Sequence, residues 1–138
     1  QLHLAGKAMP PNIFSQQSEH LKVYGMIDNA RNFMSDKQIM IVPILSGSGM
    51  RVKILEGLAA GKVIVSTTVG AEGIKYTDGE NLFIADTPQQ FITVIKKLFS
   101  DGQLVNNVSQ KAIELAYAEY DNGVIAARLI AFYKSILQ

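Results

Sequence analysis

Short apolar runs rich in β-branched residues alternate with helix-like segments along the chain, and this alternation limits the fold more than any other feature. The runs lie at residues 2–5, 21–24, 39–43, 63–66 and 82–85. Strands that alternate with helices predict a parallel sheet covered on both faces by helices. The sequence therefore predicts an α/β, Rossmann-like fold.

The connections between the first four runs differ in length and in regularity. Residues 10–11 open one short helical turn, and residues 28–36 supply another. The third connection passes from a serine–glycine stretch into a clear helix, which Gly61 is expected to end. The apolar positions that helical spacing places on one buried face of this helix are Val52, Leu55, Leu58 and Ala59.

Beyond residue 85 the pattern is wholly helical. A first helix is expected to begin at residues 87–88 and to stop at residues 101–102. Two more helices follow, and their apolar stripes predict packing against the edge of the sheet. The stripes are Val105, Val108, Ala112, Leu115 and Ala116, and then Ile125, Leu129, Phe132, Tyr133 and Ile136.

Composition bounds the class of protein. A chain of 138 residues that is 48% hydrophobic predicts one domain over residues 1–138. Thirteen basic residues against twelve acidic ones argue against nucleic acid as a partner. The absence of cysteine favours the cytoplasm, and no apolar run reaches the roughly 20 residues of a membrane span.

Because the chain starts at Gln1 and runs at once into a strand-like segment, we expect a piece of a longer protein.

The chemistry concentrates in residues 43–74, which read PILSGSGMRVKILEGLAAGKVIVSTTVGAEGI. This is a strand, a glycine loop, a helix, a strand and a second glycine loop. A loop that enters a helix at the carboxyl end of a parallel strand presents backbone N–H groups and the positive end of the helix dipole, which favour phosphate. Gly47 and Gly49 allow backbone angles and a close approach that other residues forbid, as a diphosphate requires.

Three charged residues accompany the glycine loop. Arg51 and Lys53 stand at the start of the helix, where the dipole disfavours cations unless an anion is bound. Glu56 shares a helix face with Lys53, and its carboxylate can accept both hydroxyls of a ribose. The same residues also fit a solvated ion pair beside glycines that only make a turn. The residues alone leave both interpretations open.

The second glycine loop, residues 66–73, offers hydroxyls, backbone amides and the carboxylate of Glu72 to the same crevice. An ordinary polar turn is the alternative interpretation. His3 and His20 lack the spacing of metal ligands, and no Asp-x-Asp pair is present, so neither a metal nor a cofactor is expected.

Residues 43–74 resemble the signature of the group 1 glycosyltransferases of the GT-B fold, and residues 22–27 resemble the strand and turn that precede it. The resemblance implies the nucleotide-sugar-binding, C-terminal half of such an enzyme, without the first strand–helix unit of that half. A hexosyl unit would pass, with retention of configuration, from a nucleoside diphosphate sugar to a sugar, polysaccharide or lipid-linked acceptor on an absent N-terminal domain. The fragment alone would be inactive, and the full enzyme would be cytoplasmic or peripheral to the inner membrane face.

The resemblance also implies a role for each site residue. The second of the two glutamates in the family motif falls on Glu56, which would hold the ribose. The first falls on Ser48, a departure that removes a carboxylate from beside the donor sugar. Ser48, Arg51 and Lys53 are the catalytic candidates, the last two through stabilisation of the leaving phosphate. The donor-binding candidates are Gly47, Gly49, Met50, Val52, Glu56, Thr67 and Gly70.

Two other functions use the same features. A non-catalytic module that binds a nucleotide or phosphosugar would explain Ser48, and an epimerase of sugar nucleotides would reuse the GT-B architecture. A phosphorylation receiver domain is excluded because residues 2–6 and 39–43 end without clustered acidic residues.

Overall fold

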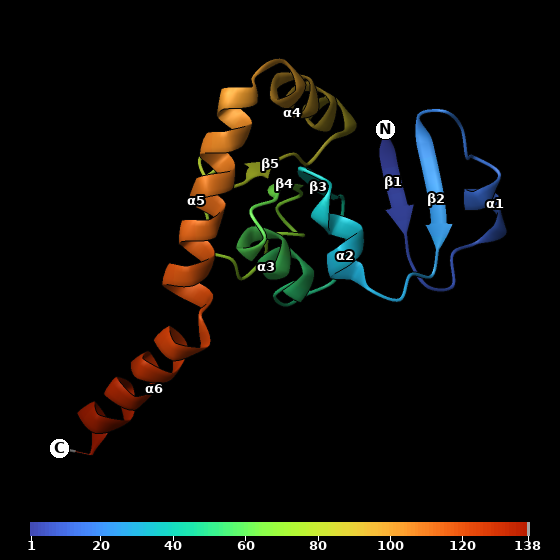
Figure 1. The fold of residues 1–138 in the computed structure, drawn as a ribbon. Coiled ribbons are helices and arrows are strands. Elements are labelled where there is room, and N and C mark those ends of the chain that lie inside the picture. The colour runs from blue at the N-terminus through green and yellow to red at the C-terminus, as the bar shows by residue number, and fades with distance from the viewer. Residues whose placement is uncertain (138) are drawn as a thin grey trace. The chain divides into compact units, whose positions relative to one another are not determined.

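Five strands form in the computed structural model, which describes residues 1–137, and all of their pairings are parallel (Figure 1). The strands pair in two separate sheets, one of two strands and one of three, whereas the sequence predicted one sheet. The chain divides accordingly into two units, residues 1–36 and the remainder from Lys37. The α/β class with parallel, Rossmann-like strands is confirmed, and the assignment of all 138 residues to one domain stays a prediction.

The first unit is a small parallel pair. Strands β1 (Leu2–Ala5) and β2 (Leu21–Gly25) are joined through the short helix α1 (Pro11–Phe14). Helix α2 (Ala30–Ser35) follows, and the side chain of Asn29 caps it by accepting a hydrogen bond from Asn32 N at 3.0 Å. The brief helical turns predicted in the first two connections are therefore present.

The second unit is built on strands β3 (Ile39–Val42), β4 (Val63–Ser66) and β5 (Phe83–Ile84), in that order across the sheet. Every residue of β4 is buried, as expected for a central strand that is covered on both faces. Because the three strands are parallel, the connections that leave their carboxyl ends lie at one edge of the sheet.

Helices cover both faces of this sheet. The buried apolar side chains of this unit form two clusters. Helix α3 (Val52–Ala59) packs in one of them and α4 (Pro88–Ser100) packs in the other. The long helix α5 (Gly102–Tyr120) contributes its first half to the α4 cluster and its second half to the α3 cluster. Its predicted packing against the sheet is thereby confirmed.

The buried face of α3 differs from the predicted one. Leu58 is fully buried as expected, but its buried partners are Ile54 and Gly57, and Leu55 is only partly buried. Val52 remains 64% exposed because it is the first residue of the helix and lies at the glycine loop. Gly61 ends the helix as predicted, with a φ of 66° and its amide bonded to Leu58 O.

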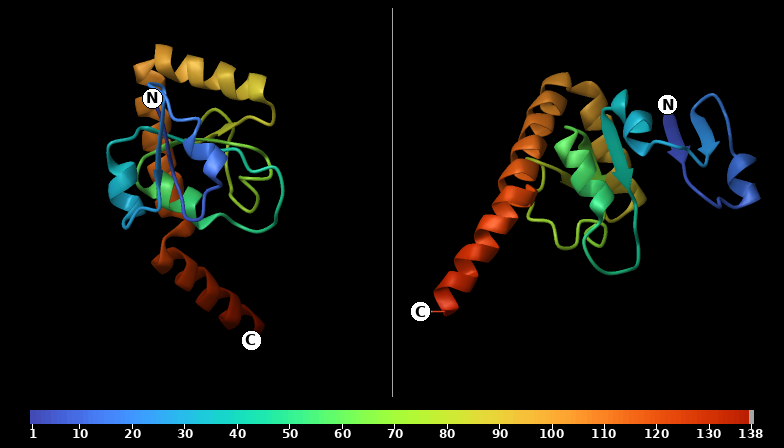
Figure 2. Two further views of the ribbon diagram at one scale, coloured as in Figure 1. Left: turned by 90° about the vertical axis from the view of Figure 1, so that its right-hand side faces the viewer. Right: turned by 60° about the horizontal axis from the view of Figure 1, so that its bottom comes forward.

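Helix α6 (Asn122–Ile136) contradicts the prediction that it packs on the sheet edge. None of its residues is buried, and Figures 1 and 2 show it running beyond α5, away from the strands of its unit. An apolar stripe predicts that a helix face needs cover but does not identify what covers it. The side chains of the stripe remain at least 47% exposed at Ile125, Leu129, Phe132, Tyr133 and Ile136.

An ion-pair network fixes α6 to the end of α5. Arg128 donates to both carboxylate oxygens of Glu119, at 2.9 and 3.2 Å, and to Ala118 O at 3.1 Å. Lys75 Nζ lies 2.7 Å from the same carboxylate. The hydrogen bonds from Arg128 and then Lys75 lower the pKa of Glu119 from 4.5 to about 2.

Acid should therefore release α6 from α5. A carboxylate whose pKa is lowered in the folded state stabilises that state above its unfolded pKa, and the contribution is lost as the pH falls from 4.5 towards about 2. We expect Glu119→Gln to accelerate hydrogen exchange of the α6 amides at neutral pH. Glu114→Gln, which breaks an ion pair within α5 alone, is the control. Equal exchange in both variants would contradict this role of Glu119.

Candidate functional site

The connections after β3, β4 and β5 meet at the carboxyl edge of the sheet, and the sequence predicted this for the first two. The Thr67 hydroxyl donates to Ile44 O and so joins the end of β4 to the end of β3. Thr68 donates to both oxygens of Asp86, through its amide at 2.7 Å and its hydroxyl at 2.8 Å. Three segments far apart in the sequence are thus held together beside the glycine loop.

The glycine loop has the backbone angles that only glycine adopts readily. Gly47 has a φ of 115° and Gly49 a φ of 85°. A side chain at Gly47 would also meet the guanidinium of Arg51, whose Nη2 lies 2.9 Å from the position of the missing Cβ. The predicted conformational need for both glycines is confirmed.

The N-terminus of α3 opens from this loop without a side-chain cap. Arg51 is the N-cap residue and makes no capping hydrogen bond. Its guanidinium instead turns back over the loop and donates to Ser48 O at 2.6 Å and to Gly49 O at 2.7 Å. Met50 and Val52 on either side are 44% and 64% exposed. The positive end of the helix dipole therefore faces an accessible surface with a cation beside it.

Lys53 and Glu56 form an ion pair on the same helix, with Nζ and Oε2 2.6 Å apart. The side chains are 59% and 43% exposed, so the pair stands at the surface. Pairs of this kind contribute about 0.2–1 kcal/mol to stability. The geometry fits both interpretations that the sequence left open, because a nucleotide can reach both groups without unfolding the helix.

Thr67 and Gly70, which were predicted to contact the donor, are buried. Thr67 is 2% exposed, and its hydroxyl accepts from Gly70 N at 2.9 Å while it donates to Ile44 O. A Cβ on Gly70 would lie 2.3 Å from Ser66 Oγ. The structure gives both residues a role in shaping the second loop, and their contact with a donor stays a prediction.

Two acidic residues belong to this edge, of which the sequence analysis placed Glu72 in the crevice and missed Asp86. Glu72 accepts a hydrogen bond from Gly49 N at 3.1 Å. The amide and then the hydroxyl of Thr68 lower the pKa of Asp86 below its usual value. Asp86 directly follows an apolar run, and an acidic residue at the end of a parallel strand is a sequence signal that could have identified it.

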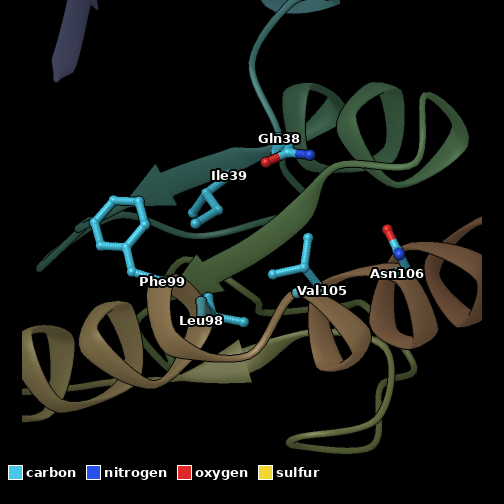
Figure 3. A pocket seen from close by; sticks show the side chains of 7 residues that line it. Gln38, Ile39, Leu98, Phe99, Val105 and Asn106 are labelled. Carbon is cyan, nitrogen blue, oxygen red and sulfur yellow. The ribbon is translucent and has the colours of Figure 1, made fainter.

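A cavity of about 300 Å³ lies elsewhere in the second unit (Figure 3). It opens beside Gln38 and Ile39 at the amino end of β3, and Leu98, Phe99 and Val105 of the α4–α5 corner complete its apolar wall. Because the glycine loop follows the carboxyl end of β3, this cavity is distinct from the site described above. Its lining offers few polar groups for a nucleotide.

Two kinds of feature are absent from residues 1–137. No helix there is both long and apolar enough to cross a membrane. No group of three or more His, Cys, Asp or Glu side chains there is arranged to hold a metal ion.

Comparison with known proteins agrees with this geometry. The sequence profile described as "Glycosyl transferases group 1" matches residues 1–101. No curated protein sequence matches the chain. Many solved structures are similar in fold, and three of them illustrate the likeness. HepE of Anabaena in complex with UDP-glucose has a TM-score of 0.78 at 18% identity, over 96% of this chain and 40% of its own.

A glycosyltransferase from Rickettsia africae has a TM-score of 0.79 at 16% identity, over 99% of this chain and 40% of its own. The C-terminal domain of LpcC from Francisella tularensis, a group 1 family protein, has a TM-score of 0.67 at 20% identity, over 76% of this chain and 56% of its own. The chain therefore spans less than two thirds of each related chain.

Proposed function

Because the chain belongs to the group 1 glycosyltransferases, we propose that it binds the nucleoside diphosphate of an activated sugar where the glycine loop enters α3. The observation that carries the proposal is the uncapped, accessible N-terminus of α3, flanked by two glycines of positive φ and by Arg51. Backbone N–H groups and the helix dipole at such a position favour phosphate.

Each side chain then has a distinct task. Arg51 turns from the carbonyls of Ser48 and Gly49 towards the diphosphate, and Lys53 exchanges part of its pairing with Glu56 for phosphate. The carboxylate of Glu56 accepts the ribose hydroxyls. Gly47, Met50 and Val52 line the approach.

The reaction that we propose is glycosyl transfer with retention of configuration. The bond from the anomeric carbon to the diphosphate oxygen breaks, a bond to an acceptor oxygen forms, and the acceptor hydroxyl releases its proton. Negative charge grows on the departing diphosphate, so the dipole of α3, Arg51 and Lys53 stabilise the transition state more than the ground state. The acceptor and the group that takes its proton belong to another domain of the full-length enzyme, and the transfer requires no bound metal.

A nucleotide panel tests the proposal. HepE was solved with UDP-glucose, so UDP, UMP, uridine and UDP-glucose come first, with GDP as a second base. We expect UDP to bind about tenfold more tightly than UMP, because the second phosphate gains charge-assisted contacts. Ligand-observed NMR on the chain gives the affinities. Uridine binding as tightly as UDP would contradict a diphosphate site.

The double variant Arg51→Ala, Lys53→Ala should abolish the preference for UDP over UMP. A control that changes the net charge equally but lies outside the site is Lys96→Ala, Lys134→Ala, and it should keep the preference. Loss in both variants would indicate only a nonspecific effect of net charge.

Transfer by the full-length protein with UDP-glucose then separates a transferase from a binding module and from an epimerase, which would release isomerised sugar nucleotide.

A further inference from the structure

Glu72 places an anion on the glycine loop. Its Oε2 accepts from the backbone amide of Gly49 across 23 residues of sequence. This amide lies just before the N-terminus of α3, where the oxygens of the proposed diphosphate would also accept hydrogen bonds from backbone amides. One N–H group cannot give a full hydrogen bond to a carboxylate and a phosphate at once.

The segment that carries Glu72 is firmly held. Ala71 and Ile74 on either side of it are 1% and 7% exposed. The turn is closed by hydrogen bonds from Ala71 N to Thr67 O at 3.0 Å and from Ile74 N to Ala71 O at 3.1 Å. Glu72 therefore projects from a fixed base, and its own side chain is the part that can move.

The glycine loop is held much less firmly. Leu45 is 80% exposed, and the hydrogen bonds that the described structure gives to the backbone of residues 45–50 involve the side chains of Glu72 and Arg51. The conformation of the loop therefore depends on the Glu72 carboxylate, which accepts from its amide, and on the Arg51 guanidinium, which donates to its carbonyls. Both contacts come from side chains that can swing away.

We propose that Glu72 is a gating residue of the donor site, whose carboxylate occupies the Gly49 amide until the diphosphate of the nucleotide displaces it. The proposal rests on the proposed function, because it takes the nucleotide to be the displacing ligand. Until ligand binds, the Glu72 carboxylate stabilises the conformation of the loop. It opposes binding of the diphosphate because it is negatively charged and because it already accepts the hydrogen bond of the Gly49 amide. The alternative is that Glu72 only stabilises the loop and keeps its hydrogen bond to Gly49 when ligand binds. In that case, removing the carboxylate would weaken binding.

The two roles predict opposite signs. For a gate, Glu72→Ala should tighten UDP binding about fivefold and Glu72→Gln, which keeps a neutral acceptor, about twofold. The control Glu80→Gln changes the net charge equally at an exposed position outside the loops and should leave the affinity unchanged. Isothermal titration of UDP into the full chain measures all three, with melting curves to confirm folding.

A second measurement follows the gate directly. The amide resonance of Gly49 should move in Glu72→Ala without ligand, and UDP should move it in the wild-type chain. Unchanged or weaker UDP binding in both Glu72 variants, while the wild type binds UDP, would overturn the gate and leave the proposed function standing. Absence of UDP binding in the wild type and in both variants would overturn both.

Discussion

Glu56→Ala is expected to weaken UDP binding at least about 100-fold, because two charge-assisted hydrogen bonds to the ribose, each of about 1.5–3 kcal/mol, are lost. The stability of the chain should change little, since the pair with Lys53 is exposed and contributes at most about 1 kcal/mol. Titration calorimetry with UDP measures the first effect and thermal unfolding the second.

The chain supplies a close control for this variant. Lys111 and Glu114 form a pair of the same spacing on α5, with Nζ and Oε2 2.8 Å apart and side chains 60% and 50% exposed. Glu114→Ala should therefore match Glu56→Ala in stability and leave UDP binding intact. If Glu56→Ala also left binding intact, the pair with Lys53 would be a solvated ion pair without a part in the site.

Gly70→Ala is expected to destabilise the chain by about 3 kcal/mol, at the upper end of the usual cost of overpacking a core. The added Cβ would lie 2.3 Å from Ser66 Oγ and 3.1 Å from Val42 O, and Ser66 is fully buried. Ser66 cannot move without breaking its hydrogen bond to Thr67 O at 3.0 Å. Thermal unfolding should show a midpoint lower by roughly 10 °C.

Gly102→Ala serves as the matched substitution. A Cβ on Gly102 meets no atom within 4 Å, and the residue begins α5, so alanine should be neutral or stabilise the chain by about 0.5 kcal/mol. Equal stability of the two variants would contradict the tight packing of the second loop around Gly70.

Local patterns predicted the elements well, because their causes are local. Four consecutive buried residues in β4 and the positive φ of Gly61 follow from residue type and spacing. The glycine loop was recognisable because Gly47 and Gly49 stand between a strand and a helix. These features need no knowledge of the rest of the chain.

The errors concern contacts between distant segments. The sequence does not show that Thr67 is buried or that Glu72 reaches Gly49, since each depends on how separate connections pack. The apolar stripe of α6 looked like a helix face on a sheet, but spacing alone carries no information on the partner.

Amide chemical-shift mapping during a UDP titration tests the central claim, that the glycine loop and the N-terminus of α3 hold a nucleoside diphosphate. We predict the largest shifts at the amides of Gly47, Gly49, Val52 and Lys53, with small shifts around the cavity at Ile39 and Phe99. Binding that shifts the cavity residues and leaves the glycine loop unmoved would contradict the claim, as would no binding at all.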